Sequence, residues 1–257
     1  FASLKQRHGI THLYFIASDG ICELRAHCPL QRGDLINRFT FLESQRTGED
    51  AWGIELGRLS TFTLRYVKPW RVDGRLLGYV ELGMEIEHVA AALAKTLDAR
   101  VTTFVKKEYT SAEKYEAGRE AFGFAGQWDH YPNFVTTCQI ARSFPADVLR
   151  QVESSLSPTA AAAVFTTREG GARLACVVTP LPDAAGRDVA RLVVVRDVTV
   201  EANAAWRTLL TAHGLITLLS VVTLGLLWLA SGKAERQLAA TFAALRGSEQ
   251  HMAATLR

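Results

Sequence analysis

The sequence lacks the features of several common protein classes. It has no dense block of lysine or arginine, and its 29 basic and 26 acidic side chains leave a net charge of +3. Proteins that follow a phosphate backbone need such a block, so we expect no nucleic-acid partner. Disorder is equally disfavoured, because 48% of the 257 residues are hydrophobic and can fill one large or two small cores.

Cysteine is scarce, and its spacing argues against a metal site. The four cysteines form no CxxC pair and have no histidine at zinc-ligand spacing, so we expect no metal. If the region lies outside the cytoplasm, Cys138 and Cys176 could form a disulfide. Buried free thiols are the alternative interpretation.

Catalytic motifs are missing as well. The sequence contains no GxSxG, HExxH, P-loop or GxGxxG pattern, and its seven histidines are scattered. His130 lies in the aromatic stretch WDHYPNF without an identifiable partner, so we interpret Trp128, Tyr131 and Phe134 as packing residues. We expect no catalytic residue and no cofactor in this chain.

One long apolar run is present near the C-terminus. Residues 208–232 carry no formal charge and are bounded by Arg207 and Lys233. About 20 apolar residues in a helix cross a 30 Å hydrocarbon core. A buried helix of a soluble protein would keep a polar stripe, whereas Leu, Ile and Val occur here on every face. We therefore predict a connecting and transmembrane helix over residues 201–232.

Residues 233–257 predict the start of a cytoplasmic signalling helix. Basic residues exceed acidic ones directly after the span, which places this end in the cytoplasm and everything before Arg207 outside. A heptad pattern supports a coiled coil, although a solvated amphipathic tail is the alternative. The two seam positions of that pattern hold Leu238, Leu245 and Met252, and Phe242, Glu249 and Leu256.

The outer part predicts an α+β fold in which one small unit occurs twice. In the first unit, residues 1–97, strands are expected at 9–17, 21–27, 53–56, 61–69 and 76–85, with helices at 35–49 and 86–97. In the second unit, residues 98–200, strands are expected at 99–107, 161–167, 173–180 and 189–197, with helices at 111–122 and 145–156. Each unit ends with a strand that contains proline, a glycine turn, an apolar strand and a helix start.

Residues 9–88 resemble a known family. The segments GITHLYFIASDG, LRAHCPLQRGDLINRFT, GIELGRLSTFTLRYVKPW and DGRLLGYVELGMEIE are similar to the membrane-distal module of double Cache sensor domains. This resemblance implies two PAS-like modules in series, each an antiparallel sheet with flanking helices, followed by the transmembrane helix. The second unit agrees in architecture but offers no motif.

The resemblance also implies a function. Double Cache domains sense ligands outside the cell and control a kinase, a nucleotide cyclase or a chemotaxis output inside. We expect the sensor part of a bacterial inner-membrane receptor, periplasmic or extracellular and homodimeric, whose parent is a sensor histidine kinase. The alternatives are a diguanylate cyclase, a chemoreceptor, a membrane-anchored binding protein without enzymatic output, or a tethered enzyme. A second span is expected before Phe1.

Alternation along the predicted strands indicates a polar ligand pocket. An arginine fork matches a carboxylate, and aromatic rings supply apolar contact. The resemblance favours the three arginines, in the contexts LRAH, INRFT and TLRYVKP. We expect a small organic acid or amino acid as ligand, unless Arg65 is neutralised by Glu55 and Glu81; a solvated surface strip is the remaining alternative. The candidate site residues are Arg25, Arg65, Glu55, His12 and Tyr14, with Arg38 and Trp70 from the edges.

Overall fold

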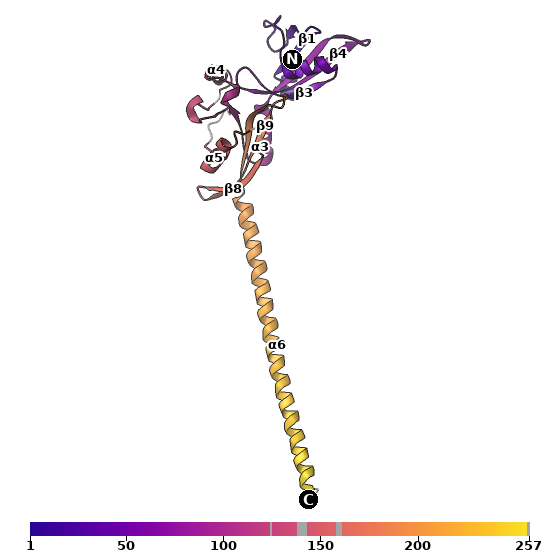
Figure 1. Ribbon diagram of the computed structural model, residues 1–257, viewed down its shortest axis with the longest axis vertical. Helices are drawn as coiled ribbons and strands as arrows, with labels where there is room; N and C mark the ends of the chain where they lie inside the picture. Colours follow the sequence, from indigo (N-terminus) through magenta and orange to yellow (C-terminus); the bar gives the residue numbers. More distant parts are fainter. Residues whose placement is uncertain (124, 138–142, 158–160, 256–257) are drawn as a thin grey trace. The chain divides into compact units, whose positions relative to one another are not determined.

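The computed structural model describes residues 1–123, 125–137, 143–157 and 161–255. The chain forms two compact units, Phe1–Val198 and Thr199–Arg257. The first unit holds two antiparallel sheets of five strands each, and the second consists of one helix (Figure 1). This is the predicted fold class, and it fits two PAS-like modules followed by a transmembrane helix.

The first sheet has the strand order β2-β1-β5-β4-β3. Its strands are β1 (His12–Ala17), β2 (Cys22–Arg25), β3 (Ala51–Leu56), β4 (Phe62–Val72) and β5 (Arg75–Glu85). Only Asp73 and Gly74 separate β4 from β5, and both have positive φ, 51° and 77°. Asp-Gly is the dipeptide that tight two-residue hairpins favour, so this turn follows directly from the sequence.

Helix α2 (Phe39–Thr47) covers one face of the first sheet. Phe41 of α2 packs edge-on against Tyr79, with the ring centroids 5.1 Å apart. The helix starts four residues later than predicted, because Ile36 donates its backbone N–H to the carbonyl of Gly20 instead of joining a helix. Two further helices belong to this part of the chain, α1 (Ala2–His8) and α3 (Ile86–Leu97).

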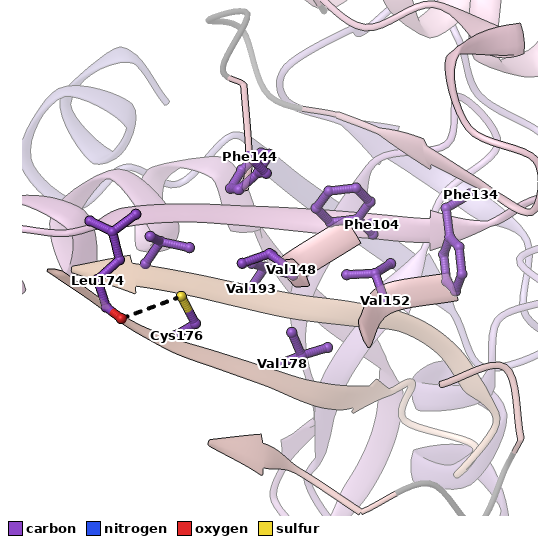
Figure 2. Packing of buried hydrophobic residues seen from close by; sticks show 10 residues of the cluster. Phe104, Phe134, Phe144, Val148, Val152, Leu174, Cys176, Val178 and Val193 are labelled. Atoms are coloured by element: carbon purple, nitrogen blue, oxygen red, sulfur yellow. Dashed lines mark hydrogen bonds between the residues drawn. The ribbon is translucent and has the colours of Figure 1, made fainter. Parts of the chain in front are cut away.

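The second sheet repeats the order of the first, β7-β6-β10-β9-β8. Its strands are β6 (Arg100–Lys106), β7 (Phe134–Thr136), β8 (Ala163–Glu169), β9 (Ala172–Pro182) and β10 (Asp188–Asp197). Helix α5 (Ala146–Ser154) packs Val148 and Val152 onto this sheet, beside Phe104 and Cys176 (Figure 2). Helix α4 (Ala112–Phe122) begins after Ser111, whose hydroxyl accepts the amide of Lys114. The predicted packing role holds for Phe134 and Tyr131 in this core.

One hydrophobic core lies between the two sheets and contains residues from both. Phe62 and Ile86, from the first half, cluster with Val105, Tyr115 and Val135. The amide of Ala184, in the β9–β10 turn, donates to the carbonyl of Ile54 in β3 over 2.7 Å. The division at residues 97 and 98 therefore stays a prediction, because one compact unit contains both sheets.

Helix α6 (Thr199–Thr255) is a single unbroken helix. Its part Thr199–Ala243 is long and apolar enough to cross a membrane, and an 18-residue window within it has a mean hydropathy of 2.0. The predicted continuity of this helix through residues 201–232 is confirmed. No proline interrupts it, so every interior amide can join the helical ladder.

The structure describes three of the four cysteines. Cys22, Cys28 and Cys176 are free thiols within the described part of the chain. Cys138 lies outside the described residues. The expected Cys138–Cys176 disulfide and its alternative therefore both stay predictions.

Candidate functional site

Arg65 forms the centre of a buried polar cluster on the α2-covered face of the first sheet. Its Nε lies 3.2 Å from Oε2 of Glu55, and its Nη1 donates to Oε1 of Glu81 over 2.5 Å. Glu81 is completely buried and Arg65 is 5% exposed. The two carboxylates come from the strands on either side of β4, so the sheet register itself brings them to the arginine.

Glycine makes room for His12 and Thr63 beside the arginine. Gly83 of β5 stands directly opposite Arg65 on one side and His12 on the other. A Cβ atom at Gly83 would come within 3.0 Å of the Cβ of His12 and of a methyl group of Thr63. A larger residue would therefore force the neighbouring side chains apart.

Glu55 has a second task at the start of α2. Its Oε1 accepts the backbone amide of Thr40 over 2.7 Å. The first amides of a helix have no partner within the helix, and a carboxylate also interacts well with the positive end of the helix dipole. Glu55 thus joins α2 to Arg65, and both positions depend on it.

Arg38, the residue before α2, reaches the same cluster from the side. Its guanidinium lies 4.5 Å from the centroid of the Tyr14 ring, and its Nη2 is 3.1 Å from Oε2 of Glu81. That contact is an ion pair without hydrogen-bond geometry. Nε and Nη2 of Arg38 and Oε2 of Glu81 are buried and have no hydrogen-bond partner among the described residues. These atoms can accept or donate further hydrogen bonds.

Arg25 is held by its own loop. Nη1 and Nη2 donate to the two carboxylate oxygens of Asp34 over 2.6 and 2.5 Å, and Nη1 also donates to the carbonyl of Gln31. This bidentate pair holds the pKa of Asp34 below its usual range. Arg25 lies 5.3 Å from the Tyr14 ring, so it borders the cluster with its charge already compensated.

His12 lies at the opposite end of the cluster. Its ring is parallel to that of Tyr14 at 6.2 Å, and its Nδ1 is 3.5 Å from Oε1 of Glu85. Burial, followed by the charge of Arg65, lowers the pKa of His12 to about 3. The ring is therefore neutral at physiological pH, and its contact with Glu85 is not a salt bridge there.

Trp70 does not join the other predicted residues. It lies on the opposite face of the sheet, where its ring contacts Phe15 at a centroid distance of 6.1 Å. Strand β4 places Arg65 and Val67 on the buried face, and Trp70 follows the alternate positions. Six of the seven predicted residues thus gather around Tyr14 and Arg65. The cluster also contains Glu81, Thr40 and Asp34, of which the last two lie outside strands and carry no alternation signal.

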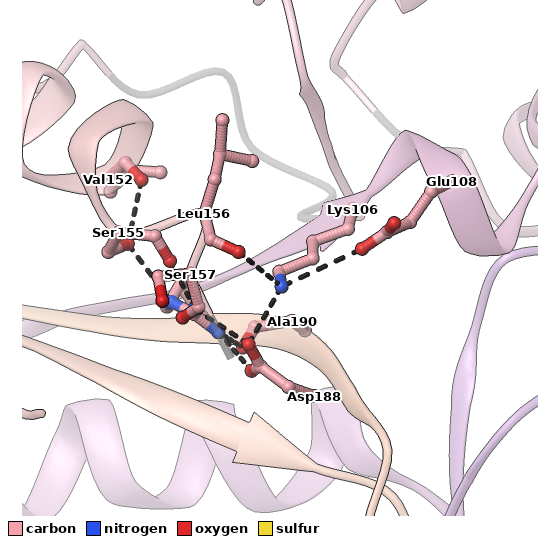
Figure 3. A network of polar contacts seen from close by, with 9 residues as sticks. Lys106, Glu108, Val152, Ser155, Leu156, Ser157, Asp188 and Ala190 are labelled. Carbon is pink, nitrogen blue, oxygen red and sulfur yellow. Dashed lines mark hydrogen bonds and ion pairs between the residues drawn. The ribbon is translucent and has the colours of Figure 1, made fainter. Parts of the chain in front are cut away.

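The second sheet carries a separate buried polar network. Nζ of Lys106 donates to Asp188 over 2.7 Å and to the carbonyl of Leu156 over 3.1 Å (Figure 3). Arg191, also fully buried, donates to Asp188 and to the hydroxyl and carbonyl of Ser155. These bonds fix the segment after α5 to β6 and β10. Because carbonyl oxygens satisfy both cations, this network is structural.

A shallow cavity of about 460 Å³ lies elsewhere, at the end of the second sheet that leads to α6. It is lined by the end of α3 and by Leu174, Val195 and Arg100. Arg100 already pairs with Glu169 at 3.3 Å and donates to the carbonyl of Ser143. No pattern in the sequence indicates this cavity.

Comparisons with known proteins give distant structural neighbours only. No family model matches the chain, and no curated protein matches it significantly. The extracellular domain of a protein described as a histidine kinase, vpHK1S-Z8, is 14% identical, with a TM-score of 0.36 over 76% of this chain and 72% of that one. A domain of a sensory box/GGDEF family protein from Vibrio parahaemolyticus is 16% identical, with a TM-score of 0.37 over 76% and 75%.

A third neighbour is the ligand-binding domain of the Campylobacter jejuni chemoreceptor Tlp3, in complex with 4-methylisoleucine. It is 12% identical, with a TM-score of 0.36 over 77% of this chain and 69% of that one. Likeness this distant carries no argument about ligand or output, so the proposal below rests on the chain's own residues.

Proposed function

We propose that this chain is the ligand-sensing part of a transmembrane signalling receptor. The observation that carries the proposal is the continuity at its C-terminal end. Strand β10 ends at Asp197, and α6 begins at Thr199 and continues through the whole charge-free run. A sensor that must report across a membrane needs such a connection between its folded part and its span.

The ligand proposed for the membrane-distal sheet is a small anionic or amino-acid-like molecule. The cluster contains two cations, Arg38 and Arg65, opposite two carboxylates, Glu55 and Glu81. These four charges cancel, so a plain anion would leave the site with a net negative charge, whereas a zwitterion brings both signs. Its carboxylate would pair with the unsatisfied Nε and Nη2 of Arg38, and its ammonium with Oε2 of Glu81.

A thermal-shift series on the full chain in nanodiscs tests this proposal. Amino acids and organic acids are added in turn, and stabilisation of wild type by at least one of them is expected. Arg38→Ala should weaken that ligand by about 10- to 150-fold, since charge-assisted hydrogen bonds contribute roughly 1.5–3 kcal/mol. The matched control is Arg46→Ala, because Arg46 is exposed on α2 and pairs only with Glu43.

The outcomes are distinct. Stabilisation that disappears in Arg38→Ala and remains in Arg46→Ala supports the site. No stabilisation by any compound would remove the ligand-binding role and leave the polar cluster as scaffold. Equal stabilisation in all three proteins would place the ligand elsewhere, for example in the cavity beside Arg100.

The output that we propose is a histidine kinase. A diguanylate cyclase or a chemoreceptor would need the same connection through α6. A membrane-anchored binding protein would need a span but no continuity between sheet and helix. The helix α6, which has no interruption from Thr199 to Thr255, favours a receptor over a simple anchor.

A further inference from the structure

Two glutamates, Glu85 and Glu87, flank Ile86, which follows the last strand of the first sheet and packs into the core between the sheets. Glu85 is the last residue of β5, and Ile86 and Glu87 open α3. Ile86 is buried with Phe62, Val105 and the other members of the core between the sheets. The carboxylates on either side of Ile86 therefore lie at the joint between the two sheets.

Each of the two glutamates has one inaccessible carboxylate oxygen without a hydrogen-bond partner among the described residues, and Glu85 as a whole is only 7% exposed. Oε2 of Glu85 and Oε1 of Glu87 are inaccessible and accept no hydrogen bond from the described residues. Oε1 of Glu85 has two long contacts, 3.4 Å from the hydroxyl of Thr63 and 3.5 Å from Nδ1 of His12, and the Thr61 hydroxyl also acts on this carboxylate. Hydrogen bonds of that length are weak, and a buried charged carboxylate needs strong ones.

Within the described part of the chain, no cation next to Glu85 is free to compensate its charge. The charged or titratable groups that act on it are His12 from β1, Arg65 from β4 and Glu87 from α3, and Glu55 of β3 stands in the same cross-strand row. Arg65 is already shared between Glu55 and Glu81, and His12 is neutral. From the second sheet, Glu87 meets the uncharged Thr137.

Burial raises the pKa of both glutamates. Burial, and then the charge of Glu87, raise the pKa of Glu85 from 4.5 to about 7. Burial also raises the pKa of Glu87. Glu85 thus holds its proton at a pH where an ordinary glutamate has lost it.

We propose that Glu85 and Glu87 form a proton-controlled joint between the two sheets. With a proton on Glu85, only one carboxylate charge lies beside the shared core and the joint is closed. When the proton leaves, two like charges face each other there without a cation, and the contacts across the joint loosen. The inference concerns the joint alone and does not depend on the ligand or on the orientation in the membrane.

The sign follows from the direction of each shift. The closed joint binds a proton that the open joint releases, so its stability falls as pH rises through about 7. His12 acts in the opposite sense, because its lowered pKa removes stability only as pH falls below 6.5. The pKa of His27 is lowered too, with the same sign. Above about pH 6.5, the carboxylates are therefore the groups that set the slope.

Hydrogen exchange of the full chain in nanodiscs tests the joint. The amide of Ala184 bonds across it to the carbonyl of Ile54, so peptides from the β9–β10 turn report its opening. After correction for intrinsic exchange rates, their protection should fall by roughly three- to fourfold between about pH 6.5 and pH 8, because a pKa of about 7 leaves only the end of the titration above pH 6.5. Peptides from β9, in the separate core around Cys176, should not change.

Three variants separate the joint from a general effect of pH. Glu85→Gln should remove the pH dependence at the turn, and Glu87→Gln should move its midpoint to lower pH by removing the neighbouring charge. Glu23→Gln, which neutralises an exposed glutamate of β2, should behave as wild type. A flat wild-type profile, or an unchanged midpoint in Glu87→Gln, overturns the proposal. The Glu87→Gln result decides even if Glu85→Gln does not fold.

Discussion

Arg65 shows how strongly a single buried charge can depend on its partners. Removing it would leave Glu55 and Glu81 as buried carboxylates, with Arg38 the nearest remaining cation to Glu81. Breaking a buried pair by deleting one partner costs about 3–5 kcal/mol. We expect Arg65→Ala to lower the free energy of unfolding by that amount with or without added ligand, measured by denaturant titration.

Arg46→Ala is the control for this variant as well. Arg46 pairs with Glu43 on the exposed side of α2, and exposed pairs contribute at most about 1 kcal/mol. A loss below about 1 kcal/mol in Arg65→Ala would mean that the two glutamates are not held by Arg65. In that case Arg65 would again be available to a ligand anion.

Much of the polar cluster could be predicted because strands alternate. The parity of β4 places Arg65 on the buried face, and that of β5 places Glu81 there. Arg38 and Thr40 lie at the entry to a helix, where position along the chain does not fix the direction of a side chain. Trp70 was misplaced because it was assigned to an edge of the pocket without applying the same alternation.

Among the secondary structure elements, α3 has the bounds predicted for it, whereas α2 starts four residues later than predicted. Apolar alternation and the Asp73-Gly74 turn are local signals, and β4 and β5 follow from them. The start of α2 depends on a distant contact, since the backbone of Ile36 bonds to Gly20. Strand β7 has only three residues and exists because Phe134 to Thr136 pair with β6, which no local pattern indicates.

The unbroken helix α6 makes a further prediction at this scale. Proline at Ala204 would remove a backbone hydrogen bond and clash with the preceding turn, at a cost of about 3 kcal/mol or more. We expect Ala204→Pro to uncouple the ligand from the output, while ligand binding at the first sheet persists. The measurement compares ligand affinity with output activity in the full-length receptor.

Ala204→Leu is the matched control, because leucine keeps the helix intact. Its output should respond to ligand as in wild type. An intact response in Ala204→Pro would show that signalling does not require continuity between β10 and the span.

For the whole molecule, the repeat was visible in the sequence but the assembly was not. Similar strand, turn and helix patterns predicted two units, and both sheets have the same strand order. In the core between the sheets, Phe62 and Ile86 from the first half of the outer part pack with Val105 from the second sheet. Contacts between residues so far apart leave no periodic signal along the chain.

The charges on either side of the span predict the orientation of the chain in the membrane. The basic residues after the span, beginning with Lys233, favour the cytoplasm. A phosphatase fused after Arg257 should therefore be inactive, whereas one inserted at Gly186, in the exposed β9–β10 turn, should be active. A fluorescent protein at the same two positions should give the reverse pattern, and inverted results for both reporters would invert the topology.

The equivalent ends of the two sheets have a consequence for how such chains change over evolutionary time. Strand β5 leads directly into α3, and β10 leads into α6 after one residue. Helix α3 follows the last strand of the first sheet and leads into the second sheet, since it ends just before β6. Duplication of one sheet together with the helix that follows it would produce this order of elements and leave the final strand joined to the last helix.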